Sequence, residues 1–239
     1  MKKVTLLPAT LLSILAINSF AILPVPSDVI SFYSPKGQQL LNSASNNNKA
    51  EVYKLLGYFT TEKGTEYCAP ASITMALNSL GLTPDIAPAH KPYVMYTQNN
   101  LFYNKEVLDK YELSPPLIMG GGLTLSQAEE LVKSQRGAHA TKIFGNTIKS
   151  ADELRKILLA NYHSGKYILL NFDRASIDEV GSGHFSPLAA YNSDSDKWLL
   201  LDVARYKYPP VWVTTEQVYK SMQDKDSTSH KPRGLLIVS

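Results

Sequence analysis

Three segments in the first two thirds of the chain have apolar residues at helical spacing, and they predict helices over residues 71–80, 124–134 and 151–162. Ser150, with Glu153 three residues later, has the pattern of a capping box at the start of the third helix. Short apolar runs separated by turn residues follow, and these predict consecutive antiparallel strands. The runs are residues 167–172, 184–191, 198–203, 211–213 and 235–239. Helices first and strands second predict an α+β fold.

The only cysteine of the sequence, Cys68, lies in the segment 67–70 that opens the first predicted helix. Pro70 suits a first helical turn, because its missing N–H group would have no partner there. Gly81 suits the position just after the last turn. Cys68 is therefore expected at a helix N-terminus.

The N-terminal segment resembles a secretory signal. Two lysines precede an apolar run, and Ser19 and Ala21 place small residues where signal peptidases cleave. We therefore expect a signal peptide over residues 1–21 and one catalytic domain over residues 22–239, exported to the periplasm or secreted, with no stable membrane insertion after cleavage. An uncleaved membrane anchor is the alternative.

The amino-acid composition argues against several classes of protein. The chain has 239 residues, of which 44% are hydrophobic and 19% charged, so it can bury a sizeable core. A net charge of +3 is too weak to indicate a nucleic-acid-binding protein. One cysteine excludes a disulfide within the chain and a cysteine-based zinc finger. Because oxidising compartments damage exposed thiols, a lone cysteine in an exported protein indicates a reactive role.

His184 is the best partner for this thiol, because it alone among the five histidines opens a predicted strand, directly after a Gly-Ser-Gly sequence. Asp202 ends the next predicted strand, where its carboxylate can orient the imidazole. The order Cys, His, Asp is the papain-like arrangement. A core cysteine and a turn-forming aspartate are the alternatives for these residues. The other histidines lie in loops or polar stretches: His90, His139, His163 and His230.

Several stretches of the sequence resemble phytochelatin synthases, in the same order along the chain. The resemblance is most distinctive over residues 201–213, and it covers nearly all of the mature chain. It also includes residues 59–61, 67–68, 77–80, 96–102, 171–174 and 183–191. The chain is thus similar to the short bacterial members of the family, which lack the Cys-rich C-terminal half of the eukaryotic enzymes.

This resemblance implies a papain-like fold, with a helical half that carries the cysteine packed on an antiparallel sheet half. Cys68 would be the nucleophile, His184 the base and Asp202 its orienting carboxylate. The family cleaves the Cys–Gly bond of glutathione through a γ-Glu-Cys acyl-enzyme, which water or a second glutathione then resolves, and short bacterial members are associated mainly with hydrolysis. The residues expected near the substrate are Arg174, Tyr206 and Arg233.

The chain departs from the papain-like pattern at Glu62. Papain-like enzymes carry a glutamine six residues before the nucleophile, and its side-chain N–H group helps to form the oxyanion hole. An ionised Glu62 would repel the oxyanion, whereas a neutral Glu62 could donate a hydrogen bond. Two other functions therefore stay open: a different exported papain-like peptidase, and an inactive protein that binds thiols or metal thiolates.

The sequence predicts no protein-bound metal, because its histidines are scattered and it has one cysteine. Cadmium or zinc would then arrive as thiolate complexes of the substrate glutathione. The sequence leaves open whether the chain forms a homodimer.

Overall fold

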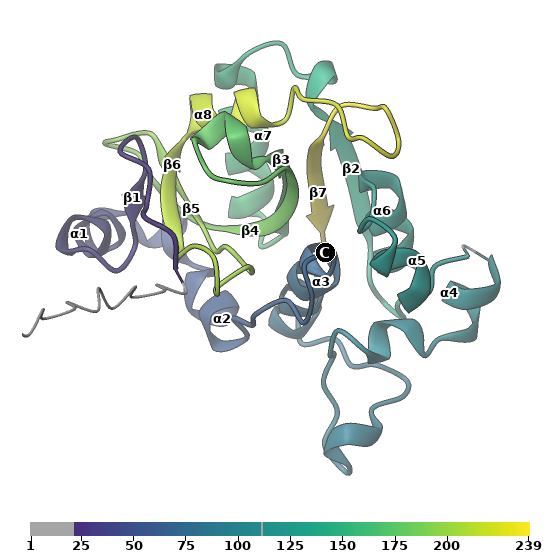
Figure 1. Ribbon diagram of the computed structural model, residues 1–239. Coiled ribbons are helices and arrows are strands. Elements are labelled where there is room, and N and C mark those ends of the chain that lie inside the picture. The colour runs from purple at the N-terminus through teal and green to yellow at the C-terminus, as the bar shows by residue number, and fades with distance from the viewer. Residues whose placement is uncertain (1–21, 111) are drawn as a thin grey trace, which may run out of the picture.

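The structure is a computed structural model that describes residues 22–110 and 112–239 (Figure 1). The expected signal peptide, residues 1–21, lies outside the described residues. Within the described part, no helix is both long enough and apolar enough to span a bilayer.

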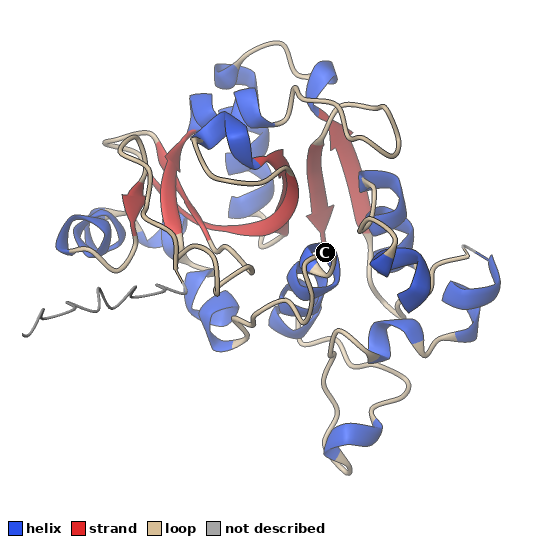
Figure 2. Cartoon of the chain, in the orientation of Figure 1, coloured by secondary structure: helices blue, strands red, loops and turns tan. Residues whose placement is uncertain are grey.

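A single antiparallel sheet runs through the middle of the described residues (Figure 2). Its seven strands have the order β1-β6-β5-β4-β3-β7-β2. The strands are β1 (Ile30–Ser31), β2 (Ala140–Phe144), β3 (Tyr167–Asp173), β4 (Gly183–Asn192), β5 (Lys197–Leu200), β6 (Val211–Thr214) and β7 (Gly234–Val238). The α+β class predicted from the sequence is confirmed.

Strands β3 to β6 form the antiparallel meander that the apolar runs predict. The last strand departs from it, because β7 does not follow β6 in the sheet but lies between β3 and β2. The predicted strand over residues 198–203 is also shorter, since β5 ends at Leu200. Asp202 consequently lies in the connection after the strand.

The α-helices of the described residues are α1 (Pro35–Ser43), α2 (Val52–Gly57), α3 (Cys68–Ser79), α4 (Lys105–Lys110), α5 (Pro115–Met119), α6 (Leu125–Lys133), α7 (Ala151–His163) and α8 (Thr215–Ser221). Among them, α3, α6 and α7 confirm the three segments that were predicted from helical spacing. Gly81 has φ of 74°, as a glycine after a helix end should. The sequence pattern does not predict α1, because this helix has few apolar residues.

Both faces of the sheet are covered by helices, and this explains why its strands are apolar without alternation. Helices α3 and α6 pack on one face, where Leu169 and Trp212 contribute to the larger core. Helices α7 and α8 cover the other face, where Leu170 and Trp198 contribute to a second core (Figure 1). Every residue of α3 is buried, so Cys68 starts a helix at the centre of the molecule.

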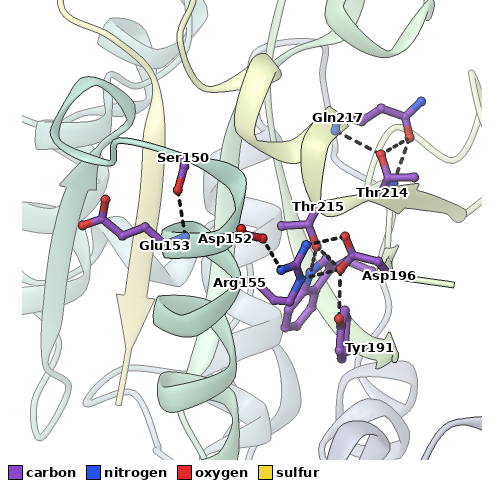
Figure 3. A network of polar contacts seen from close by, with 10 residues as sticks. Ser150, Asp152, Glu153, Arg155, Tyr191, Asp196, Thr214, Thr215 and Gln217 are labelled. Carbon is purple, nitrogen blue, oxygen red and sulfur yellow. Dashed lines mark hydrogen bonds and ion pairs between the residues drawn. The ribbon is translucent and has the colours of Figure 1, made fainter. Parts of the chain in front are cut away.

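A polar network on the α7 side ties this helix to the sheet (Figure 3). Arg155 donates two hydrogen bonds of 2.7 Å to the carboxylate of Asp196, which also accepts from Tyr191. Half of the predicted capping box forms: Ser150 caps Glu153 N–H, but the Glu153 carboxylate accepts from the backbone of Lys149 instead of Ser150. This network lies on the face of the sheet opposite α3.

Candidate active site

The thiol of Cys68 lies where the first turn of α3 meets strand β4. Cys68 is the first helical residue and is 7% exposed. One turn further on, the Ser72 hydroxyl donates to the carbonyl of Phe185, which is on β4. This bond fixes the start of the helix against the strand residue that follows His184.

His184 and Asp202 form the hydrogen-bonded pair that the sequence predicts. The Nε2 atom of His184 is 2.9 Å from Oδ1 of Asp202, and both side chains are buried. The ring also packs edge-on against Phe172, its neighbour across β3 and β4. With Nε2 engaged, Nδ1 is the ring nitrogen left to take a proton from the thiol.

Asp202 is held as an anion by several donors. Arg174 donates to Oδ1 at 2.9 Å and lies 2.7 Å from Oδ2, and the N–H group of Ala204 donates to Oδ1. Burial would raise the pKa of Asp202, but His184 and Arg174 together lower this pKa well below its usual range. The carboxylate therefore stays ionised and keeps the imidazole in one orientation.

The pKa of the Cys68 thiol is raised, although a position at a helix N-terminus by itself would lower it. Burial and, to a smaller extent, the nearby Glu62 together raise the pKa of Cys68 to about 12, against opposing effects of the Phe185 and Ala69 backbone and of Arg174. Burial and Arg174 lower the pKa of His184, against the opposing effect of Asp202. At neutral pH these shifts favour a thiol beside a neutral imidazole.

Glu62 lies beside the thiol, as its position six residues before Cys68 suggests. A carboxylate oxygen of Glu62, Cys68 Sγ and a ring nitrogen of His184 lie within 4.8 Å of one another. Glu62 is 4% exposed, its Oε1 accepts a 2.7 Å hydrogen bond from Tyr206, and its Oε2 has no hydrogen-bond partner. Burial raises the pKa of Glu62 to about 7, although the Tyr206 bond opposes this.

The backbone around Glu62 is fixed on both sides. Its N–H group donates to the carbonyl of Val203, which directly follows Asp202. The side chain of Gln98 accepts from Lys63 N–H and donates to the Thr61 carbonyl. The segment before α3 is therefore held in place at the two residues that flank Glu62.

A pocket of about 400 Å³ opens beside the thiol, and both Cys68 and His184 line it. Arg233 lies in its wall, 3.6 Å from Asp226. The Arg233 guanidinium packs against Gly183, where a Cβ atom would lie 2.1 Å from Nη1. A larger residue at position 183 would require the Arg233 guanidinium to move away from this place.

The structure separates the three residues expected near the substrate. Arg233 lines the pocket that contains Cys68. Arg174 does not line this pocket; its side chain is buried and contacts Asp202 and Glu179. Tyr206 is 42% exposed and lines a different hollow, although its hydroxyl reaches Glu62.

Three further polar groups at the site were not predicted as site residues. Asp226 lines the pocket from the connection before β7. Asn171 lines it from β3 and has a buried Oδ1 without a hydrogen-bond partner. Glu179 is buried against Arg174, and burial raises its pKa to about 7. Glu179 and Asp226 lie outside the predicted elements and the resembling stretches, whereas Asn171 lies in a predicted strand whose apolar pattern does not single it out.

The structure places His163, His139 and His230 in surroundings different from those of His184. Nε2 of His163 is 2.8 Å from the Asn48 side chain, and His139 is exposed. His230 directly follows a turn and has φ of 56°. The side chain of His90 lies outside what the structure describes.

A buried thiol at a helix N-terminus lies beside an imidazole from an antiparallel sheet, which pairs with a carboxylate from the connection after strand β5. This is the layout of cysteine sites of the papain-like type. Comparison with known sequences assigns the family. The family model for phytochelatin synthase matches residues 20–235, and the chain belongs to that family.

Several curated relatives carry the name glutathione gamma-glutamylcysteinyltransferase. Transferase 3 of Lotus japonicus is 28% identical over 219 residues, covering 91% of this chain and 43% of the relative. Transferase 1 of Arabidopsis thaliana gives the same figures of 28%, 219 residues, 91% and 43%. The Schizosaccharomyces pombe protein is 28% identical over 223 residues, covering 92% of this chain and 51% of the relative. The chain thus spans about half the length of these relatives or less.

Proposed function

We propose that the protein is a cysteine enzyme that cleaves glutathione at its Cys–Gly bond and forms a γ-Glu-Cys thioester on Cys68. The observation that carries this proposal is the pocket, which brings Cys68 and His184 together with the charged pair Arg233 and Asp226. The γ-glutamyl end of glutathione carries a carboxylate and an ammonium group. Arg233 suits the carboxylate and Asp226 the ammonium.

In the first half-reaction, Cys68 Sγ attacks the cysteinyl carbonyl carbon while Nδ1 of His184 takes the thiol proton. The C–N bond to glycine then breaks, and His184 returns the proton to the leaving amine. Asp202 stabilises the imidazolium that exists between these steps. Glycine leaves, and the γ-Glu-Cys group stays on Cys68 as a thioester.

In the second half-reaction, water attacks the thioester and yields γ-Glu-Cys, or the amino group of a second glutathione attacks and yields phytochelatin. We propose that hydrolysis predominates, as the resemblance to short bacterial members suggests. Cadmium or zinc enters this scheme as the thiolate complex of the substrate. No residue of the chain is required to hold the metal for this reaction.

Glu62 in its neutral form is proposed as a donor to the oxyanion that develops during attack. Its Oε1 already accepts from Tyr206, so a proton on Oε2 would have no other partner. Burial favours the neutral form of this carboxyl group. The backbone N–H group of Cys68 would be the second donor, as at other sites of this type.

Glycine release from glutathione tests the proposed function. Wild-type protein and the Cys68→Ser variant are incubated with glutathione, and free glycine is quantified. We expect release by the wild type only. Equal release by both proteins, or none by either, would contradict the proposal, and cleavage of ordinary α-peptides but not of glutathione would favour another papain-like peptidase.

Export to the periplasm or the medium is also part of the proposal and rests on the sequence of residues 1–21. Expression with the native N-terminus in a double-membrane bacterium, followed by fractionation and N-terminal sequencing, tests it. A periplasmic protein that begins at residue 22 is expected. A protein that keeps Met1 in the cytoplasm would contradict export.

A further inference from the structure

The nucleophile, the base and Glu62 together form a set of donor atoms that suits a metal ion. The sulfur of Cys68, an imidazole nitrogen of His184 and a carboxylate oxygen of Glu62 lie within 4.8 Å of one another, and all three side chains are buried. Sulfur, nitrogen and oxygen donors together are a set that Zn²⁺ accepts. Three protein ligands leave a fourth position for water, and Cys68 and His184 line an open pocket.

Glu62 supplies an independent observation that points to a ligand. Its side chain is buried at 4% exposure, and Oε2 has no hydrogen-bond partner. Tyr206 binds the other oxygen and so fixes the carboxylate. A buried carboxylate oxygen without a partner costs free energy unless a proton or a cation occupies it.

The surroundings of His184 match those of a zinc-binding histidine. Such histidines usually give one ring nitrogen to the metal and bond the other to a carboxylate, which orients the ring. Here Nε2 is 2.9 Å from Asp202 Oδ1, which leaves Nδ1 for a metal. Ligand atoms around a tetrahedral zinc are about 3.5 Å apart. A spacing of up to 4.8 Å therefore has to close by about 1 Å.

We propose that Cys68, His184 and Glu62 bind a free Zn²⁺ ion that inhibits the enzyme by occupying its nucleophile and its base. On binding, the Cys68 S–H bond breaks, a sulfur–zinc bond forms and the proton leaves to solvent. Zinc here is an inhibitor and not a cofactor. The inference uses the proposed function only for its effect on activity, because zinc binding itself can be measured without substrate.

Metal binding is tested on the purified protein, stripped of metal, without glutathione. Zn²⁺ is titrated by calorimetry, and Co²⁺ is used as a spectroscopic probe of thiolate ligation. We expect one equivalent of Zn²⁺ and a thiolate-to-cobalt charge-transfer band. Cys68→Ser should lose the band and at least about a hundredfold of the zinc affinity, since even outer-shell changes cost 10–100-fold.

Two further variants separate the ligands from the rest of the chain. Glu62→Gln keeps the shape but lacks the anionic oxygen, so zinc affinity should fall at least about tenfold. His139→Ala removes an exposed histidine and should bind zinc as the wild type does. Unchanged stoichiometry and affinity in Cys68→Ser, or no binding by the wild type, would overturn the inference.

Inhibition is measured separately, by glycine release. Free Zn²⁺ in excess over its glutathione complex should abolish release, and a chelator should restore it. If zinc binds through Cys68 and no glycine is released under any condition, the metal site stands and the proposed function fails. If glycine is released and free zinc neither binds nor inhibits, the function stands and the metal site fails.

Discussion

His184 Nε2 lies 2.9 Å from Oδ1 of Asp202, and Arg174 donates a hydrogen bond to the same oxygen. The Asp202 carboxylate therefore connects the base of the site to a buried guanidinium. Loss of its charge should remove the group that stabilises the imidazolium during attack. We expect Asp202→Asn to lower kcat by about 10⁴, as the loss of this charge does at a related triad.

Asp196 provides a matched control for this substitution. It also binds an arginine, but on the opposite face of the sheet (Figure 3). Asp196→Asn should lower the melting temperature without changing kcat for glycine release. A loss of less than about tenfold in Asp202→Asn, or an equal loss in both variants, would show that Asp202 does not orient the base.

The Cys68 thiol should be unreactive in the resting enzyme at neutral pH. Its pKa of about 12 predicts that the rate of alkylation by iodoacetamide rises about tenfold per pH unit up to at least pH 10. Because the chain has one cysteine, incorporation measured by intact mass reports this thiol alone. A rate that is already constant from pH 6 to pH 8 would indicate a thiolate–imidazolium pair instead.

Glu62→Gln should be faster than wild type at alkaline pH. Below its pKa of about 7 Glu62 keeps a proton that it can donate, and above this pH the proton is lost. The ratio of variant to wild-type kcat/KM should therefore rise about tenfold per pH unit above pH 7, up to the 10²–10³ that one oxyanion donor contributes. These pH profiles are recorded with a chelator, so that trace metal does not affect them.

The Tyr206→Phe variant also tests the role of Glu62, because it removes the hydrogen bond that Tyr206 donates to Oε1 of Glu62. The Tyr206 hydrogen bond lowers the Glu62 pKa, so its loss should raise this pKa and move the alkaline decline of activity to higher pH. An identical pH profile in wild type, Glu62→Gln and Tyr206→Phe would contradict the role of Glu62.

Arg174 should act mainly through stability and through Asp202. Arg174→Met leaves Asp202 and Glu179 buried without their cation, which should lower the free energy of unfolding by about 3–5 kcal/mol. Arg155→Met, whose partners Asp152 and Asp196 are partly exposed, should cost less. Denaturant unfolding measures both. A raised KM with unchanged stability in Arg174→Met would indicate substrate contact, as the sequence resemblance suggests.

The sequence predicts the triad because each member occupies a recognisable position. Cys68 precedes a proline that suits a helix start, and His184 follows glycines that open a strand. Asp202 lies beside His184 because adjacent strands of a meander are close together. The resemblance to phytochelatin synthases adds Arg233, and the papain-like spacing before the nucleophile points to Glu62. The places of both residues depend on loops that periodicity does not describe.

Other features depend on burial and on contacts between distant segments, which the sequence does not show. A helix N-terminus should lower a thiol pKa, yet the complete burial of α3 raises that of Cys68. Arg174 is committed to two buried carboxylates, one of them 28 residues away. Strand β7 pairs with β3 and not with β6, the strand that precedes it in the chain. This pairing brings Arg233 to the pocket.

The acyl-enzyme tests the central claim most directly. Wild-type protein is mixed with glutathione, quenched in acid within the first turnover and analysed by intact mass, with Cys68→Ser as the control. The account predicts a γ-Glu-Cys adduct on the wild type that maps to Cys68 and is absent from the variant. Glycine release without an adduct in the wild type, or an equal adduct on Cys68→Ser, would contradict nucleophilic attack by Cys68.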